Sequence, residues 1–244
     1  LRSAAAAAER GGAVPLSDVE LLAPIPRPRQ DVVCLGMNYR DHAEESARYS
    51  ADAFTKNCTA AVYFSKRVSE AGKPDGVIPR HAGLTDRLDY EAELAVVLGK
   101  AARDVKAADA ADCIFGYTVL NDVSARDLQT GHKQWYFGKS LDGFTPMGPV
   151  LVTADEIAYP PALEITSRVN GELRQKSNTA LLITSIGQIL EELTGGMTLL
   201  PGTIIATGTP AGVGMGFDPP RFLQSGDTVE CAIEGIGTLC STVI

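Results

Sequence analysis

Short apolar runs separated by turn-forming residues dominate the chain from residue 31 onward. Runs of about 4–8 residues rich in Val, Ile and aromatic side chains, bounded by Gly, Pro, Asn or Asp, are typical of β-strands. One boundary is Asn170-Gly171, a pair that tolerates the positive φ angles of a type I′ hairpin turn. The pattern predicts strands at residues 31–36, 61–65, 90–98, 115–120, 150–153, 164–169, 203–206, 228–233 and 239–243.

Helical periodicity is much rarer than strand patterning. Residues 184–193 place apolar side chains at spacings of three and four before Gly195-Gly196, which predicts one helix and its end. A second helix is predicted to include residues 107–111, and the Ala-rich stretch 3–10 predicts a short one. Residues 38–50 are polar and rich in Glu, which is typical of a helix or a mobile lid.

The order of these elements predicts a mostly β chain of the α+β class, with few helices and no internal repeat. We expect residues 31–244 to form one domain, because chains rich in β-structure often reach about 200–250 residues as a single unit. Residues 1–30 are expected to be a peripheral segment, punctuated by prolines at positions 15, 24, 26 and 28.

Composition and charge narrow the class of protein. The 244 residues carry 22 Lys and Arg against 30 Asp and Glu, a formal net charge of −8, which argues against a nucleic-acid partner. No apolar stretch reaches the roughly 18 residues of a membrane span. The five cysteines include no C-x-x-C pair, so free buried thiols are predicted rather than a disulfide framework. We expect a cytoplasmic protein, and a mitochondrial location stays open because the printed sequence begins at Leu1.

Three carboxylates are the first candidates for chemistry. Glu91 and Glu93 share one face of a strand that becomes apolar on both faces by Ala95, which indicates a central, buried strand. Asp122 follows the next apolar run. Buried carboxylates need a counter-charge, and ligands that offer only oxygen suit Mg²⁺, Mn²⁺ or Ca²⁺ rather than zinc. The alternative is a solvated edge strand with two ordinary surface glutamates.

Two further patterns are each ambiguous on the residues alone. If a helix begins near Asp41, His42 and Glu45 lie three residues apart on one face, as in a general base oriented by a carboxylate. Spacing alone favours a surface histidine instead. The glycine-rich stretch 207–216 (TGTPAGVGMG) either lets the backbone approach a ligand closely or forms a tight turn between strands.

Taken together and in order, five segments resemble the fumarylacetoacetate hydrolase superfamily. They are 36–45 (GMNYRDHAEE), 89–98 (DYEAELAVVL), 116–129 (GYTVLNDVSARDLQ), 138–149 (GKSLDGFTPMGP) and 207–214 (TGTPAGVG). The run NDVSARDLQ downstream of E-x-E is highly specific, and the chain is most similar to short members of the acylpyruvase and oxaloacetate tautomerase type. This resemblance implies the mixed β-roll of the family and a homodimer.

The resemblance also assigns roles to particular residues. It implies a Mg²⁺ or Mn²⁺ ion, with Ca²⁺ a substitute in crystals, and it overturns the surface reading of the histidine. The implied metal ligands are Glu91, Glu93 and Asp122; the implied catalytic residues are His42, Glu45 and Lys139; and the implied substrate-binding residues are Arg126, Gln129 and Thr209.

The activity implied by the resemblance is hydrolysis of a C–C bond in a small acylpyruvate-like 1,3-dicarbonyl acid, through an enolate that the metal stabilises. The alternatives are an oxaloacetate tautomerase or decarboxylase and an isomerase of hydroxymuconate-type acids, which would use the same metal site. A module that keeps the fold and binds a metal or ligand without turnover is a third hypothesis. The expected partner is a small anionic 2-oxo acid, with neither nucleic acid nor membrane.

Overall fold

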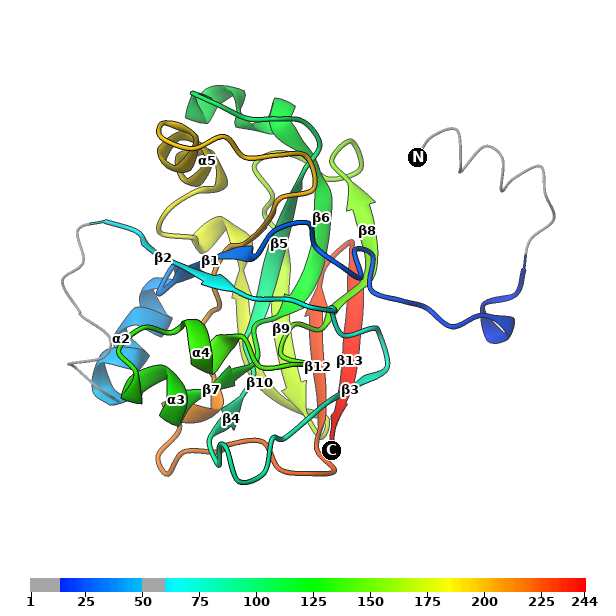
Figure 1. Ribbon diagram of the computed structural model, residues 1–244, viewed down its shortest axis with the longest axis vertical. Coiled ribbons are helices and arrows are strands. Elements are labelled where there is room, and N and C mark those ends of the chain that lie inside the picture. Colours follow the sequence, from blue (N-terminus) through cyan, green and yellow to red (C-terminus); the bar gives the residue numbers. More distant parts are fainter. Residues whose placement is uncertain (1–13, 50–59) are drawn as a thin grey trace.

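Two β-sheets form the body of the protein in a computed structural model that describes residues 14–49 and 60–244 (Figure 1). One sheet has six strands in the order β2 (Val62–Lys66), β1 (Val32–Gly36), β11 (Ile204–Ala206), β5 (Ala92–Leu98), β6 (Ile114–Asn121) and β8 (Met147–Thr153). The other has five, in the order β10 (Glu172–Asn178), β9 (Glu164–Val169), β12 (Thr228–Ile233), β13 (Gly237–Val243) and β3 (Gly76–Ile78). A short pair joins β4 (Leu88–Asp89) to β7 (Ser124–Ala125).

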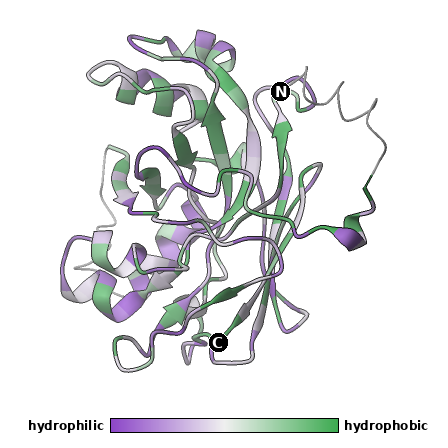
Figure 2. Cartoon of the chain, turned by 45° about the vertical axis from the view of Figure 1, so that its right-hand side comes forward, coloured by the Kyte–Doolittle hydropathy of each residue, from purple (hydrophilic) through white to green (hydrophobic). Residues whose placement is uncertain are grey.

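The main core lies where the two sheets face each other. Strands β5 and β6 of the larger sheet contact β9 and β12 of the smaller one, and the hydrophobic colour of Figure 2 follows these strands. Every residue of β5 is buried. Leu94 and Val96 join this core, while Ala95 and Val97 point to a second cluster that Ala23 and Ile25 help to cover. This double burial explains why β5 is apolar on both faces beyond its first two residues.

The helices are short and lie at the ends of the sheets. Helix α5 (Ile186–Thr194) begins at a capping box between Ser185 and Gln188 and packs on the 3₁₀ helix η2 (Ala107–Cys113). Helices α2 (Arg40–Tyr49), α3 (Arg126–Gly131) and α4 (Tyr136–Lys139) lie together beside β1 and β2 in Figure 1. Three further 3₁₀ turns are η1 (Leu16–Asp18), η3 (Thr179–Leu181) and η4 (Gly214–Gly216).

The predicted mostly β fold is confirmed, and every predicted strand is present with its ends shifted by at most three residues. The hairpin turn is confirmed as well, because Asn170 and Gly171 have φ angles of 52° and 79°. The helix predicted around 107–111 is a 3₁₀ helix rather than an α-helix. Strands β3 and β10 and helices α3 and α4 were not predicted, since they are short or polar and carry little periodicity.

The described part of the chain settles two smaller expectations. Cys34, Cys113, Cys231 and Cys240 are free thiols, as predicted, and the first three are buried; Cys58 lies outside the described residues, as does the helix predicted for 3–10. Among the described residues, none of the helices has the length and apolar character needed to cross a membrane.

Candidate metal centre and active site

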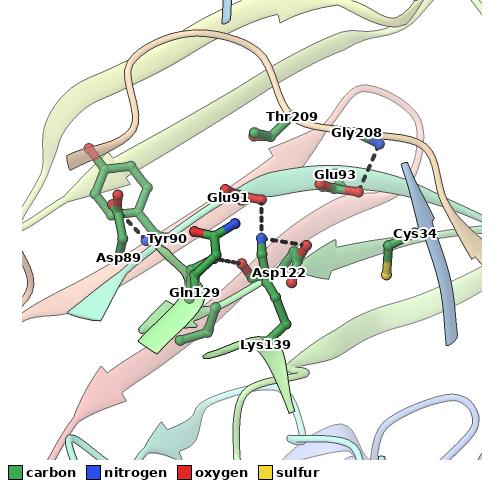
Figure 3. A network of polar contacts seen from close by, with 12 residues as sticks. Cys34, Asp89, Tyr90, Glu91, Glu93, Asp122, Gln129, Lys139, Gly208 and Thr209 are labelled. Carbon is green, nitrogen blue, oxygen red and sulfur yellow. Dashed lines mark hydrogen bonds and ion pairs between the residues drawn. The ribbon is translucent and has the colours of Figure 1, made fainter. Parts of the chain in front are cut away.

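Strand register brings the three predicted metal ligands together. Strands β5 and β6 are antiparallel with Ala92 opposite Asn121, so the next pair outward is Glu91 and Asp122. The Asp122 N–H donates to the Glu91 carbonyl at 2.9 Å, and Glu93 follows one strand repeat further along. One carboxylate oxygen from each of Glu91, Glu93 and Asp122 lies within 4.8 Å of the others, and all three residues are buried. Figure 3 shows the three side chains converging.

Two buried lysines lie against this carboxylate cluster. Lys139, at the end of α4, donates to Glu91 Oε2 at 2.7 Å and to Asp122 Oδ2 at 2.8 Å (Figure 3). Lys66, at the end of β2, pairs with the other oxygen, Asp122 Oδ1, and donates to the Val123 carbonyl at 3.1 Å. Burial lowers the pKa of Lys139, but Asp122 and Glu91 outweigh this effect and raise it overall. The two lysines therefore bind different oxygens of Asp122, Lys66 binding Oδ1 and Lys139 binding Oδ2.

The three carboxylates are electrostatically unequal. Burial raises the pKa of Glu91, but Lys139 and Arg126 more than compensate and lower it overall. Burial raises the pKa of Glu93 well above its usual value, and the neighbouring charges of Asp122 and Glu91 raise it further. The only hydrogen bond shown for the Glu93 carboxylate among the described residues comes from the Gly208 N–H, at 2.8 Å. The raised pKa favours the protonated form of Glu93 until a cation enters the cluster.

This donor set fits a hard divalent cation. Three carboxylates supply only oxygen, which suits Mg²⁺, Mn²⁺ or Ca²⁺, and burial beside two other carboxylates raises the pKa of Glu93. No histidine or cysteine belongs to the cluster among the described residues, which argues against zinc.

Binding of Mn²⁺ is expected to release about one proton per ion, because Glu93 must give up its proton to become a ligand. Affinity for Mn²⁺ should therefore rise with pH. Calorimetric titrations in PIPES and in Tris at the same pH measure the release, since the two buffers differ in ionisation enthalpy. Equal apparent enthalpies in both buffers would show that Glu93 is already charged.

A second network surrounds Arg126, the first residue of α3. Its Nη1 contacts Glu91 Oε1 at 2.6 Å and donates to Gln129 Oε1 at 3.1 Å, and its Nε donates to Asp89 Oδ2 at 2.8 Å. Its Nη2 is buried and has no hydrogen-bond partner among the described residues. Arg126 therefore presents one free N–H₂ group, as a residue that receives an anionic ligand would. Asp89, like Lys66, was not among the residues selected from the sequence.

The predicted dyad is present on helix α2. His42 Nδ1 lies 3.1 Å from Glu45 Oε2, and both side chains are more than 90% buried. Glu45 Oε1 also accepts a hydrogen bond from the Gly212 N–H at 3.0 Å. A Cβ at Gly216 would lie only 2.0 Å from Glu45 Oε1. The glycine-rich loop therefore lets the backbone approach this carboxylate, and it seats helix α2 over the site.

The pocket between these groups leaves about 280 Å³ free of protein atoms, including its opening to solvent. One wall is apolar, where the rings of Phe64 and Trp135 meet edge to face with centroids 5.1 Å apart. Thr209 donates to the Ala92 carbonyl at 2.9 Å and accepts from Gln175 Nε2 at 2.7 Å. All nine residues selected from the sequence lie at the pocket or in contact with a group that lines it, although their roles stay predictions. The lining includes Leu35, Gly36, Met37, His42, Phe64, Glu91, Glu93, Arg126, Gln129, Trp135, Lys139 and Thr209.

The mixed β-fold buries three carboxylates, which could hold a metal ion, in a site that also contains a His–Glu pair. Residues 31–244 match the family model for the C-terminal domain of fumarylacetoacetate (FAA) hydrolase, and the chain belongs to this family.

Relatives of the chain catalyse several reactions. It is 49% identical over 228 residues to the oxaloacetate tautomerase YisK of Bacillus subtilis, covering 93% of this chain and 74% of the relative. A 2-hydroxyhepta-2,4-diene-1,7-dioate isomerase from Mycobacterium marinum superposes with a TM-score of 0.76 at 40% identity, over 96% of this chain and 81% of that one. A fumarylpyruvate hydrolase from Pseudomonas aeruginosa, solved with Mn²⁺ and pyruvate, gives 0.76 at 30% identity, over 88% and 89%.

Proposed function

We propose that this protein is a divalent-metal-dependent enzyme that hydrolyses a C–C bond in a small acylpyruvate-like acid. The observation that carries the proposal is the buried triad Glu91, Glu93 and Asp122, with one oxygen of each within 4.8 Å of the others, two of whose members line a pocket together with His42. The fumarylpyruvate hydrolase that resembles this chain was solved with Mn²⁺ and pyruvate. We propose Mg²⁺ or Mn²⁺ as the ion and residues 31–244 as the catalytic domain; a homodimer stays a prediction of the resemblance.

The charges of the buried network suit an anionic substrate. With all four ionised, the carboxylates of Asp89, Glu91, Glu93 and Asp122 outnumber by one the cations of Lys66, Arg126 and Lys139, and with Glu93 protonated the charges balance. A divalent cation that replaces the Glu93 proton leaves this cluster with a net positive charge. When bound, the ion supplies a Lewis acid that stabilises negative charge on the 2-oxo-acid end of the substrate. The free Nη2 group of Arg126 is the protein's own donor for the same anion.

The protein's side chains divide the remaining tasks. Glu45 engages His42 Nδ1, and Nε2, which lies 3.5 Å from the Ser46 hydroxyl, is the nitrogen that takes a proton from water. The hydroxide adds to the distal carbonyl carbon, and Lys139 stabilises the oxyanion that forms. The C–C bond then breaks, its electron pair stays with the pyruvate fragment, and a proton from the imidazolium completes that product. The acyl group leaves as a carboxylic acid, so one water is consumed and no redox partner is needed.

Tautomerisation of oxaloacetate is the second candidate, because the relative at 49% identity is an oxaloacetate tautomerase. The reaction needs an acid–base residue to move a proton between carbon and oxygen, and it needs no attacking water. The same His42, Arg126 and carboxylate cluster could serve it. Decarboxylation of oxaloacetate and isomerisation of a hydroxymuconate-type acid use the same groups. These activities are therefore distinguished by testing which substrate the protein converts.

A proton NMR time course distinguishes the candidates. Acetylpyruvate and oxaloacetate are each incubated with the purified protein in Mg²⁺ and again in EDTA. We expect Mg²⁺-dependent formation of acetate and pyruvate from acetylpyruvate. If acetylpyruvate survives while oxaloacetate reaches its keto–enol equilibrium or loses CO₂ faster than in the blank, the protein is a tautomerase or decarboxylase and the hydrolase assignment is wrong.

A further inference from the structure

A buried carboxylate outside the predicted ligand set connects the pocket to the loop behind helix α2. Asp89 is fully buried, and its two oxygens accept four hydrogen bonds. Oδ2 accepts from Arg126 Nε at 2.8 Å and from the Met215 N–H at 2.9 Å. Oδ1 accepts from the Gly214 N–H at 2.6 Å and from the Tyr90 N–H at 2.9 Å. With about four acceptor sites on a carboxylate, this group is fully used.

One side of Asp89 fixes the guanidinium of Arg126. The bond to Nε leaves Nη1 to contact Glu91 at 2.6 Å and Gln129 at 3.1 Å, and it leaves Nη2 without a partner among the described residues. A planar guanidinium held at two of its three nitrogens has little rotational freedom. The direction in which the free Nη2 presents its protons is therefore set by Asp89 together with Glu91.

Both oxygens of Asp89 also fix the loop on which helix α2 rests, Oδ2 through the Met215 N–H and Oδ1 through the Gly214 N–H. The Gly214 and Met215 amides bind Asp89, and two residues earlier the Gly212 amide binds Glu45 of the helix. The contact is reinforced by an apolar cluster, in which residues of the loop pack with residues before and within the helix and with the pocket wall. Its members are Val213, Met215, Met37, Tyr49, Trp135 and Phe222.

We propose that Asp89 is a positioning residue that couples the anion-binding guanidinium of Arg126 to the docking of helix α2, and hence to the placing of His42. The inference rests on the proposed function, in which Arg126 and His42 act on one substrate. Because a single carboxylate bonds both groups, a displacement of the guanidinium by a bound anion moves the acceptor of the Gly214 and Met215 amides. The coupling runs through a continuous chain of hydrogen bonds, from Arg126 through Asp89 and the loop amides to Glu45.

The variant Asp89→Asn tests this coupling with little change in size. An amide has one acceptor oxygen, so its NH₂ group must take the place of Oδ2 or of Oδ1. In the first case it faces Arg126 Nε and the Met215 N–H, and in the second the N–H groups of Gly214 and Tyr90; all four are donors. We expect kcat/KM to fall about 10–100-fold, the range typical of residues that hold metal ligands or catalytic groups in place by hydrogen bonds. Amide hydrogen exchange should become faster in both 40–49 and 212–216. Asp86→Asn, an exposed position three residues upstream, is the matched control and should leave all readouts unchanged.

Affinity for Mn²⁺, measured by calorimetry, separates coupling from a general loss of structure. The proposal requires the affinity of the Asp89→Asn variant to stay within about threefold of the wild type, well inside the about 10–100-fold loss seen when a metal site is disturbed. If metal affinity and turnover fall together, Asp89 serves the metal centre and the coupling is refuted. Unchanged kcat/KM with unchanged exchange in 40–49 refutes it as well.

The wild-type protein provides a test that needs neither the variant nor turnover. Oxalate with Mn²⁺ offers the pocket a planar dianion, and exchange is followed with and without it. Segments 40–49 and 212–216 should slow together and by similar factors; slowing of one without the other overturns the coupling. A wild type that turns over neither acetylpyruvate nor oxaloacetate refutes the proposed function but leaves this binding test intact.

Discussion

Replacing His42 by alanine is expected to lower Mg²⁺-dependent hydrolysis of acetylpyruvate by about 10²–10⁴-fold, the contribution of a well-placed general base. The imidazole is buried, is held by Glu45 at 3.1 Å and lines the same pocket as Glu91 and Glu93. Its removal leaves water near the site without a proton acceptor. The measurement is the initial rate of acetate formation at saturating Mg²⁺, followed by proton NMR.

Two matched variants make the result specific. His132→Ala removes an exposed histidine from the end of α3 and should leave the rate within about twofold of the wild type, because surface substitutions rarely matter. Glu45→Gln keeps the shape of the dyad, removes its charge and should lose part of the same rate factor. Hydrolysis by His42→Ala at close to the wild-type rate would show that the dyad assignment is wrong. Unchanged Mn²⁺ affinity in all three variants would exclude an indirect effect on the metal centre.

The strands could be predicted because their signal is local. Strand β5 is apolar on both faces and ends in turn residues, so its existence follows from the sequence, and its seven buried residues agree. Helices α3 and α4 have only six and four residues, too few to show a period of 3.6 residues per turn. Their positions depend on tertiary contacts such as that of the Gly138 Cα, where an added Cβ would lie 2.5 Å from the Gln129 nitrogen.

The site could be predicted only in part, for a related reason. Glu91 and Glu93 alternate on one strand, which is a local pattern, and Asp122 ends the next run of the antiparallel pair. Lys66 is one lysine at the end of a strand, and nothing nearby in sequence shows that its amine reaches Asp122, 56 residues away. Asp89 is adjacent to the E-x-E pattern, but its partners Gly214 and Met215 are more than 120 residues distant.

Helix α2 shows that the resemblance to a family predicted the burial of His42, which the local sequence pattern did not predict. Spacing alone favoured an exposed His42, because helix α2 is polar on most of its surface. The structure instead buries His42, Glu45 and Ser46 on one side of the helix. What makes the difference is the glycine loop, since a side chain at Gly216 would occupy the position of the Glu45 carboxylate. Burial of this polar face is therefore decided by residues some 170 positions later in the chain.

The substitution Glu93→Gln is expected to remove metal binding while leaving the fold intact. In the metal-free protein the protonated form of Glu93 is favoured, because burial and the charges of Asp122 and Glu91 raise its pKa. A glutamine is neutral and of the same shape, so it mimics this protonated side chain. It cannot become the third negatively charged ligand when a cation enters. We expect affinity for Mn²⁺ to fall by more than about 100-fold, the upper end of what supporting residues cost, and turnover to become undetectable at ordinary Mg²⁺ concentrations.

Glu164→Gln is the matched control, because Glu164 is also on a strand but is exposed and pairs only with the surface residue Lys176. Thermal unfolding in EDTA should give the same midpoint for both variants and the wild type, while added Mn²⁺ should raise the midpoint of the wild type and of Glu164→Gln only. Raised stability of Glu93→Gln in Mn²⁺ would place the ion elsewhere. Unfolding of Glu93→Gln at a much lower temperature in EDTA would show instead that Glu93 is charged in the metal-free protein. These outcomes differ because burial and the charges of Asp122 and Glu91 raise the pKa of Glu93, so its neutral form costs the metal-free fold little.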